Sequence, residues 1–158
     1  MTKSVLCEFL SLILVAVSTV VAQAQISGLP PDCHEQECNK LLGEQDSLRQ
    51  SQDYRTGEKT SLAAAQLRLK CSEEVRGDQR AFFLDDYAAD MESAIGFAGS
   101  LRDDRKGCAL VREDKYVLKQ AIASNKFSAK WTGALTSRID GAAIYKGMCP
   151  FVNGRYAI

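Results

Sequence analysis

The chain contains 158 residues with a formal net charge of zero, and this length favours a single globular domain. The charge is unevenly distributed: residues 25–101 carry 8 Lys or Arg against 14 Asp or Glu, whereas residues 102–158 carry 11 against 5. Two interpretations are open: the acidic half packs beside the basic half, or the surface is polarised and steers a charged partner. No basic run is interleaved with aromatic residues, which argues against binding of nucleic acid.

The first 24 residues have the pattern of a signal peptide. Lys3 precedes an apolar run over residues 9–21, and residues 22–24 supply the small-x-small pattern recognised by signal peptidase. The apolar run is too short to span a bilayer as a helix, and no later segment approaches that length. We therefore expect a mature chain of residues 25–158, secreted or periplasmic and not attached to a membrane. A retained N-terminal anchor is the alternative.

Residues 25–77 predict a polar helical hairpin. Asp32 and Glu35 form an acidic version of the capping box, which places the start of the first helix at Asp32. The glycine within residues 54–59 is typical of a turn, and a second helix is expected over residues 60–76.

Residues 78–158 predict the main part of a helical bundle. Apolar residues recur at helical spacing, and strand signals are nearly absent apart from an Asn-Gly turn close to the C-terminus. A charged loop is expected over residues 102–107. Helices are expected over residues 79–101, 113–124 and 128–147, and the first of these is expected to be the central helix. The predicted fold is all-α, a disulfide-stapled bundle of about five helices built from two antiparallel hairpins around this central helix.

Five cysteines remain after residue 24, and in an oxidising compartment cysteines form disulfides by default. Two helices joined by a tight turn are antiparallel, so residues equidistant from the turn face each other. This geometry favours the pairs Cys38–Cys71 and Cys108–Cys149, because their midpoints fall at the expected turns. Cys33 is then a free thiol that could link two chains. The competing arrangement joins Cys33 to Cys71 and frees Cys38.

The segment His34-Glu35-x-x-Cys38 differs by one residue from the His-Glu-x-x-His helix of zinc proteases. His34 and Cys38 would lie on one helix face, where both could ligate zinc. However, no second histidine exists, Cys38 is well placed for a disulfide, and Glu35 has a capping role. We therefore expect no metal, no cofactor and no catalytic residue, and we do not expect an enzyme.

Acidic residues also pair along the expected central helix. Asp86 and Asp90 share a helix face, as do Asp85 and Glu92 more loosely. Paired carboxylates can perform acid–base catalysis, but a solvated acidic face is the more common reason for such a pattern.

Aromatic residues suggest an alternative role as a carrier of a small apolar ligand. Phe82, Phe97 and Trp131 could line a ligand cavity, although packing in the core is the more common role of such side chains. A metal-dependent enzyme is the third alternative.

A resemblance to a known group rests on the C-terminal half. The small residues of "AIGFAGSL", followed by Cys108 and by two helices that end at Cys149-Pro150, resemble the periplasmic immunity proteins of type VI secretion amidase effectors. The resemblance covers residues 83–150 and carries over no functional residue. It implies a secreted, α-helical, disulfide-bonded protein that plugs a toxic amidase. Together with the polarised charge and the lack of catalytic motifs, it predicts a protein that acts by binding another protein.

Overall fold

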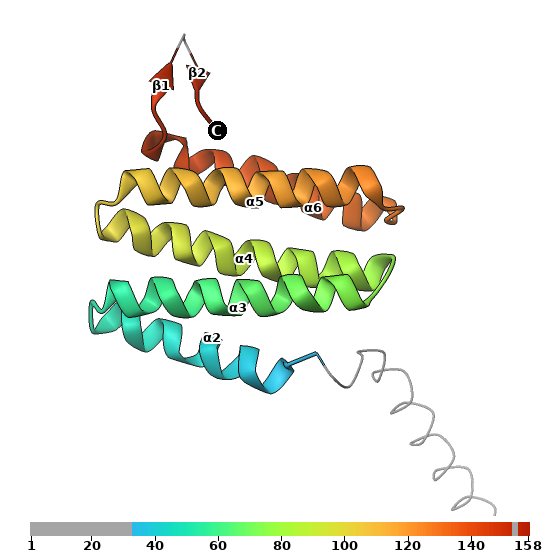
Figure 1. The fold of residues 1–158 in the computed structure, drawn as a ribbon, viewed down its shortest axis with the longest axis horizontal. Helices are drawn as coiled ribbons and strands as arrows, with labels where there is room; N and C mark the ends of the chain where they lie inside the picture. The colour runs from blue at the N-terminus through green and yellow to red at the C-terminus, as the bar shows by residue number, and fades with distance from the viewer. Residues whose placement is uncertain (1–32, 153–154) are drawn as a thin grey trace, which may run out of the picture. The chain divides into compact units, whose positions relative to one another are not determined.

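The structure, a computed structural model, describes residues 33–152 and 155–158, so the predicted signal peptide lies outside the described residues. The chain separates into a unit of residues 1–31 and a unit of residues 32–158. The fold is the predicted all-α bundle with a small β-hairpin at its C-terminal end (Figure 1). Its elements are α2 (Glu35–Gln50), α3 (Tyr54–Glu74), α4 (Asp78–Ser100), α5 (Asp104–Ser124), α6 (Ala129–Gly141), the 3-10 helix η1 (Ala142–Met148), β1 (Phe151–Val152) and β2 (Arg155–Tyr156).

Helices α2 to α5 lie side by side in chain order, each joined to the next by a short turn (Figure 1). The contact between α3 and α4 is the most extensive in the described unit, and α4 also packs against α5 and α6. Helix α4 is therefore the central helix, as predicted. The negative charge of the first half is concentrated in α2 and α4, whereas α5 and the segments that follow it are basic.

The main core is built around α4. Tyr87 and Met91 of this helix are buried, and α5 and α6 contribute fully buried residues such as Val111 and Leu135. The predicted apolar stripe of the central helix is thus the buried face of α4. Among the described side chains, the last one packed against this core is that of Met148, and those of Val152 and Tyr156 in the β-hairpin are exposed.

Helices α3 and α5 both begin earlier than predicted, and for the same reason. Asp53 accepts a hydrogen bond from the backbone N–H of Thr56 at 3.2 Å, and Asp103 accepts one from Lys106 at 3.0 Å. Each aspartate is therefore an N-cap of the kind that satisfies a free N–H in the first helical turn. The predictions of a turn over residues 54–59 and a loop over 102–107 are wrong for this reason.

The start of α2 also differs from the prediction. The helix begins at Glu35, and its N-cap residue is His34, which has a left-handed backbone with φ of 45° and makes no side-chain capping hydrogen bond. The predicted start at Asp32 is therefore wrong, and the capping role of Asp32 lies outside the described residues.

Two disulfides connect distant parts of the described chain. Cys108 pairs with Cys149, as predicted, with Cα atoms 4.9 Å apart. Cys71 pairs with Cys33, with Cα atoms 5.5 Å apart, so the predicted Cys38–Cys71 bond and the predicted free thiol at Cys33 are wrong. The turn between α2 and α3 lies at residues 51–53, and this turn is centred between positions 33 and 71. Residues equidistant from the turn do face each other, but the turn lies before the predicted residues 54–59.

Candidate functional site

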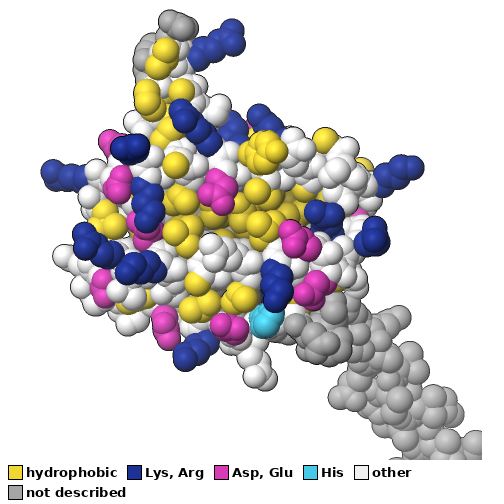
Figure 2. Space-filling view, viewed as in Figure 1, with side chains coloured by type: hydrophobic (Ala, Val, Ile, Leu, Met, Phe, Trp, Pro, Cys, Tyr) yellow, Lys and Arg dark blue, Asp and Glu magenta, His cyan; other side chains and the backbone are white. Residues whose placement is uncertain are grey.

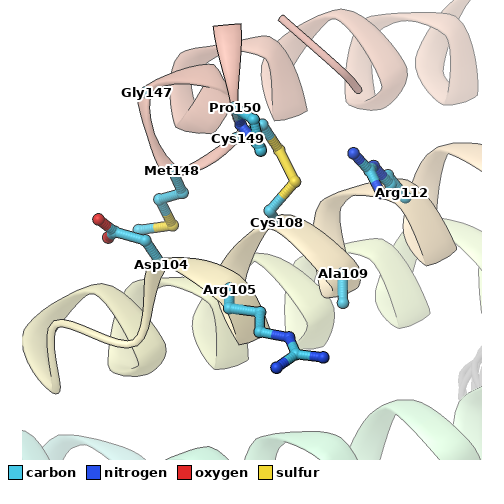
Figure 3. Close-up of a pocket in the computed structure, with 9 residues that line it drawn as sticks. All are labelled: Asp104, Arg105, Cys108, Ala109, Arg112, Gly147, Met148, Cys149 and Pro150. Carbon is cyan, nitrogen blue, oxygen red and sulfur yellow. A yellow bond between two sulfur atoms is a disulfide. The ribbon is translucent and has the colours of Figure 1, made fainter. Parts of the chain in front are cut away.

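A cavity of about 550 Å³ lies where the Cys108–Cys149 disulfide joins α5 to the segment after η1 (Figure 3). Its apolar lining includes Ala109, Met148 and Pro150, and its charged lining is Asp104, Arg105 and Arg112. The volume falls within the range of sites that take a small molecule or an inserted side chain.

Two glycines allow the wall of this cavity to form. The side chain of Met148 occupies the space where a Cβ atom would lie at Gly99 of α4 and at Gly107 of α5. The 3-10 helix η1 is thereby held close to both helices, and it positions Cys149 beside Cys108. Gly99 thus marks a close approach between α4 and η1.

The β-hairpin extends from the bundle (Figures 1 and 2) and begins directly after Pro150, which lines this cavity. Phe151 pairs with Tyr156 and Val152 with Arg155 in antiparallel register. Two contacts connect the hairpin segment to the helices: the Arg112 Nε–H donates to the Ala157 carbonyl at 2.5 Å, and the Lys146 Nζ lies 5.7 Å from the centre of the Tyr156 ring. The hairpin is therefore attached to α5 and η1.

Large apolar side chains are exposed in this region. Of the seven such residues in the described part of the chain, four lie in the last fifteen positions: Ile144, Val152, Tyr156 and Ile158. Tyr116, which is 66% exposed, lies on α5 one helical turn after Arg112. Isolated exposed apolar residues are common, but a cluster is typical of an interaction site.

We define the C-terminal surface by its exposed residues on α5 and on the hairpin segment. They are Arg105, Arg112, Tyr116, Val152, Arg155, Tyr156 and Ile158. Figure 2 shows hydrophobic side chains along the hairpin with Lys or Arg side chains at its tip and base. The arrangement offers apolar contact area and positive charge, but no catalytic group.

The predicted cavity aromatics do not gather at one site. Phe82 and Trp131 contact each other edge to face, with ring centres 6.1 Å apart. Phe97 is buried and lies fifteen positions after Phe82 on α4. Its ring packs against Tyr54 and the guanidinium of Arg49. None of the three lines the cavity beside the disulfide.

The acidic residues of α4 form ion pairs with arginines from other helices. Arg138 of α6 donates to both carboxylate oxygens of Asp85, at 2.8 and 3.2 Å, and to Glu92 at 3.4 Å. Arg68 of α3 lies 3.5 Å from Asp86. The interpretation as a solvated acidic face is therefore wrong, and sequence reasoning missed the pairs because the arginines come from elements distant in the chain.

Two buried carboxyl groups have no hydrogen bond to at least one oxygen within the described residues: Asp90 and Asp114. Burial raises the pKa of Asp114 to about 7, and the negative charge of Glu92 adds to the effect. Burial likewise raises the pKa of Asp90 to about 6. Such pKa values suit general acids or bases, but neither residue lines the cavity, so we assign them an effect on the pH dependence of stability.

Among the described side chains near His34 there is no set of metal ligands, and the side chains of Glu35 and Cys38 lie outside the described ones. The Nδ1 of His34 lies 3.5 Å from Glu37 on the exposed side of α2. Within the described ranges, no group of three or more His, Cys, Asp or Glu residues is close enough to hold a metal ion. No helix in the same part of the chain is long and apolar enough to cross a membrane.

Comparison of the chain with models of protein families, with curated protein sequences and with solved structures gives no match. The C-terminal surface and its cavity are therefore interpreted from their own chemistry.

Proposed function

We propose that the protein acts by binding another protein through the C-terminal surface, in the inhibitory or immunity-type manner that the resemblance implies. The observation that carries the proposal is the cluster of exposed apolar side chains on a covalently anchored hairpin. Exposing Val152 and Ile158 to water opposes solubility, and a binding partner that buries them removes this cost.

The anchoring of the hairpin supports the same function. The disulfide, the Arg112 hydrogen bond and the Lys146–Tyr156 contact hold the segment before any partner arrives. A surface ordered in advance loses less conformational entropy on binding, and this strengthens the complex. Two disulfides within the chain also support our proposal that the protein works in a secreted or periplasmic setting, because disulfides persist in oxidising compartments.

The proposal is tested by affinity capture from the secreted or envelope fraction of the source cells. The oxidised protein and the variant Val152→Ser/Ile158→Ser are immobilised in parallel, and retained proteins are identified by mass spectrometry without reductant. A protein retained by the native chain and lost by the variant is the expected partner, which is then purified and titrated.

The control variant is Phe82→Ser, which removes an exposed apolar residue of α4 outside the C-terminal surface. It should retain the partner, provided that its helical circular dichroism equals that of the native protein. Equal retention by all three proteins, or no retained protein, would contradict the proposed function.

A further inference from the structure

The cations of the C-terminal surface are not neutralised within the described part of the chain. Arg105 forms neither an ion pair nor a hydrogen bond there, and Arg112 uses only its Nε–H, on a neutral carbonyl. The one carboxylate in the cavity lining is Asp104, in the first turn of α5, where it interacts favourably with the helix dipole. The surface therefore has a surplus of positive charge.

The cavity between these cations has apolar walls. Ala109, Met148, Pro150 and the disulfide sulfurs offer no charged group. Arg105 and Arg112 also line the cavity, and Figure 3 shows their guanidinium groups on different sides of the disulfide. This combination suits an apolar side chain with carboxylates on its neighbouring residues. The apolar group would fill the cavity while the carboxylates meet the guanidinium groups, which bind carboxylates with two parallel hydrogen bonds.

A second copy of this chain fits the surface less well. Its acidic helix α2 presents Glu37, Glu44 and Asp46 to solvent, which would satisfy the charge. However, no large apolar side chain is exposed among the described side chains of α2, so none of these would fill the cavity or cover Val152.

We propose that the partner presents an acidic segment with an apolar anchor residue, which inserts into the cavity beside Cys108–Cys149 while its carboxylates pair with Arg105 and Arg112. This inference rests on the proposed function and adds the chemistry of the partner. Complementary charge also accelerates association, and exposed ion pairs are screened by salt.

The test selects peptides from a random twelve-residue display library on the oxidised protein, without reductant. Enriched sequences should combine Asp or Glu with Leu, Ile, Phe or Trp. The most enriched peptide is synthesised with a fluorescent label, and its affinity is measured by fluorescence anisotropy. We expect the affinity to fall at least tenfold between 50 and 500 mM salt, and at least tenfold in the variant Arg105→Glu/Arg112→Glu.

Two further variants separate this effect from a general change in charge or fold. Lys70→Glu/Arg76→Glu makes the same charge change at exposed positions at and just beyond the end of α3, and it should bind the peptide as the native protein does. Arg105→Glu alone leaves the Arg112–Ala157 hydrogen bond in place, so it should weaken binding without loosening the hairpin.

Three results would overturn the inference. These are enriched peptides without acidic residues, equal binding by both charge-reversed double variants, or tighter binding of a labelled twenty-nucleotide single-stranded DNA than of any selected peptide. Any of them leaves the proposed function standing if the captured protein still depends on Val152 and Ile158. Loss of that dependence defeats the proposed function itself.

Discussion

Gly57 lies in the first turn of α3, where the ring of Phe97 takes up the space that a side chain would need. A glycine inside a helix costs roughly 1 kcal/mol relative to alanine. Here the cost is offset by the close approach of α4, whose aromatic ring is almost completely buried against the glycine. Gly107 has the equivalent role in α5, facing Met148.

Gly57→Ala should therefore destabilise the protein even though alanine favours a helix. A Cβ atom at this position would lie 2.5 Å from two atoms of the Phe97 ring, and overpacking of this kind costs about 1–3 kcal/mol. The control is Gly43→Ala in α2, where nothing lies within 4 Å, and it should stabilise by up to about 1 kcal/mol. Urea unfolding of both variants measures the difference, and a stabilised Gly57→Ala protein would show that Phe97 does not pack as described.

Asp114 makes the stability of the fold depend on pH. Its carboxyl group is completely buried, and burial raises its pKa from 3.8 to about 7. Folding therefore favours the protonated form: the stabilisation is fully present below pH 3.8 and is lost as the pH rises through 7. Asp90, with its pKa raised to about 6, acts in the same direction.

Asp114→Asn should raise the free energy of unfolding at pH 8 and leave it nearly unchanged at pH 4. The amide cannot ionise, so the variant avoids a cost on the order of 2–4 kcal/mol for burying a charge at high pH. Urea unfolding at pH 4, 6 and 8 measures the effect. If the free energies of unfolding of the variant and the native protein differed by the same amount at all three pH values, the result would show that Asp114 does not titrate in the folded state.

The two helical hairpins are closed by disulfides at their open ends. Cys33–Cys71 spans 38 positions and Cys108–Cys149 spans 41, and each such loop is worth about 4 kcal/mol in the chain-entropy model. The positions follow from the turns, since residues equidistant from a tight turn face each other across an antiparallel pair.

Peptide mapping of the native protein without reductant should recover one linked peptide pair containing Cys33 and Cys71 and another containing Cys108 and Cys149. Alkylation before digestion prevents exchange between thiols, and a reduced sample is the control. Recovery of Cys38 linked to Cys71 would show instead that α2 begins before Glu35 or that the turn lies further along the chain.

Helix α6 is held on α4 by polar as well as apolar contacts. Arg138 donates hydrogen bonds to Asp85 and Glu92, and the side chain of Leu135 is buried in the core. A further bond connects the two helix starts, because the Ser128 N–H donates to Asp78 Oδ1 at 2.9 Å. Asp78, the first residue of α4, thus accepts a hydrogen bond from the residue before α6.

Within the described unit, the helical bundle and the C-terminal hairpin have different roles. Among the described side chains, the last one packed against the core is that of Met148, and Val152, Arg155 and Tyr156 of the hairpin are exposed. The bundle therefore provides stability, while the hairpin and the outer face of α5 provide the surface that we assign to partner binding.

Removal of residues 151–158 should leave the bundle folded. We expect unchanged helical circular dichroism and a loss of no more than about 1 kcal/mol, which is the typical contribution of a hydrogen bond such as Arg112–Ala157. The truncated protein should fail to retain the partner captured by the native chain. A large loss of helix on truncation would show that the hairpin is part of the core.

The helical class and the central place of α4 were predictable, because helical spacing of apolar residues is a local pattern that tertiary packing then follows. The starts of α3 and α5 were not, because Gly57 and Gly107 signal a turn until Phe97 and Met148 are brought against them. Because the turn between α2 and α3 was predicted too late in the chain, Cys38 was paired with Cys71 in place of Cys33.

The ion pairs and the candidate surface depended wholly on tertiary structure. Arg138 is 53 residues from Asp85, and no local pattern relates them. The cavity likewise joins residues of α5 to the segment from Gly147 to Pro150, which only the folded chain brings together. Local spacing determines which segments are helices, whereas the contacts that form a surface are made between segments, and those exist only after packing.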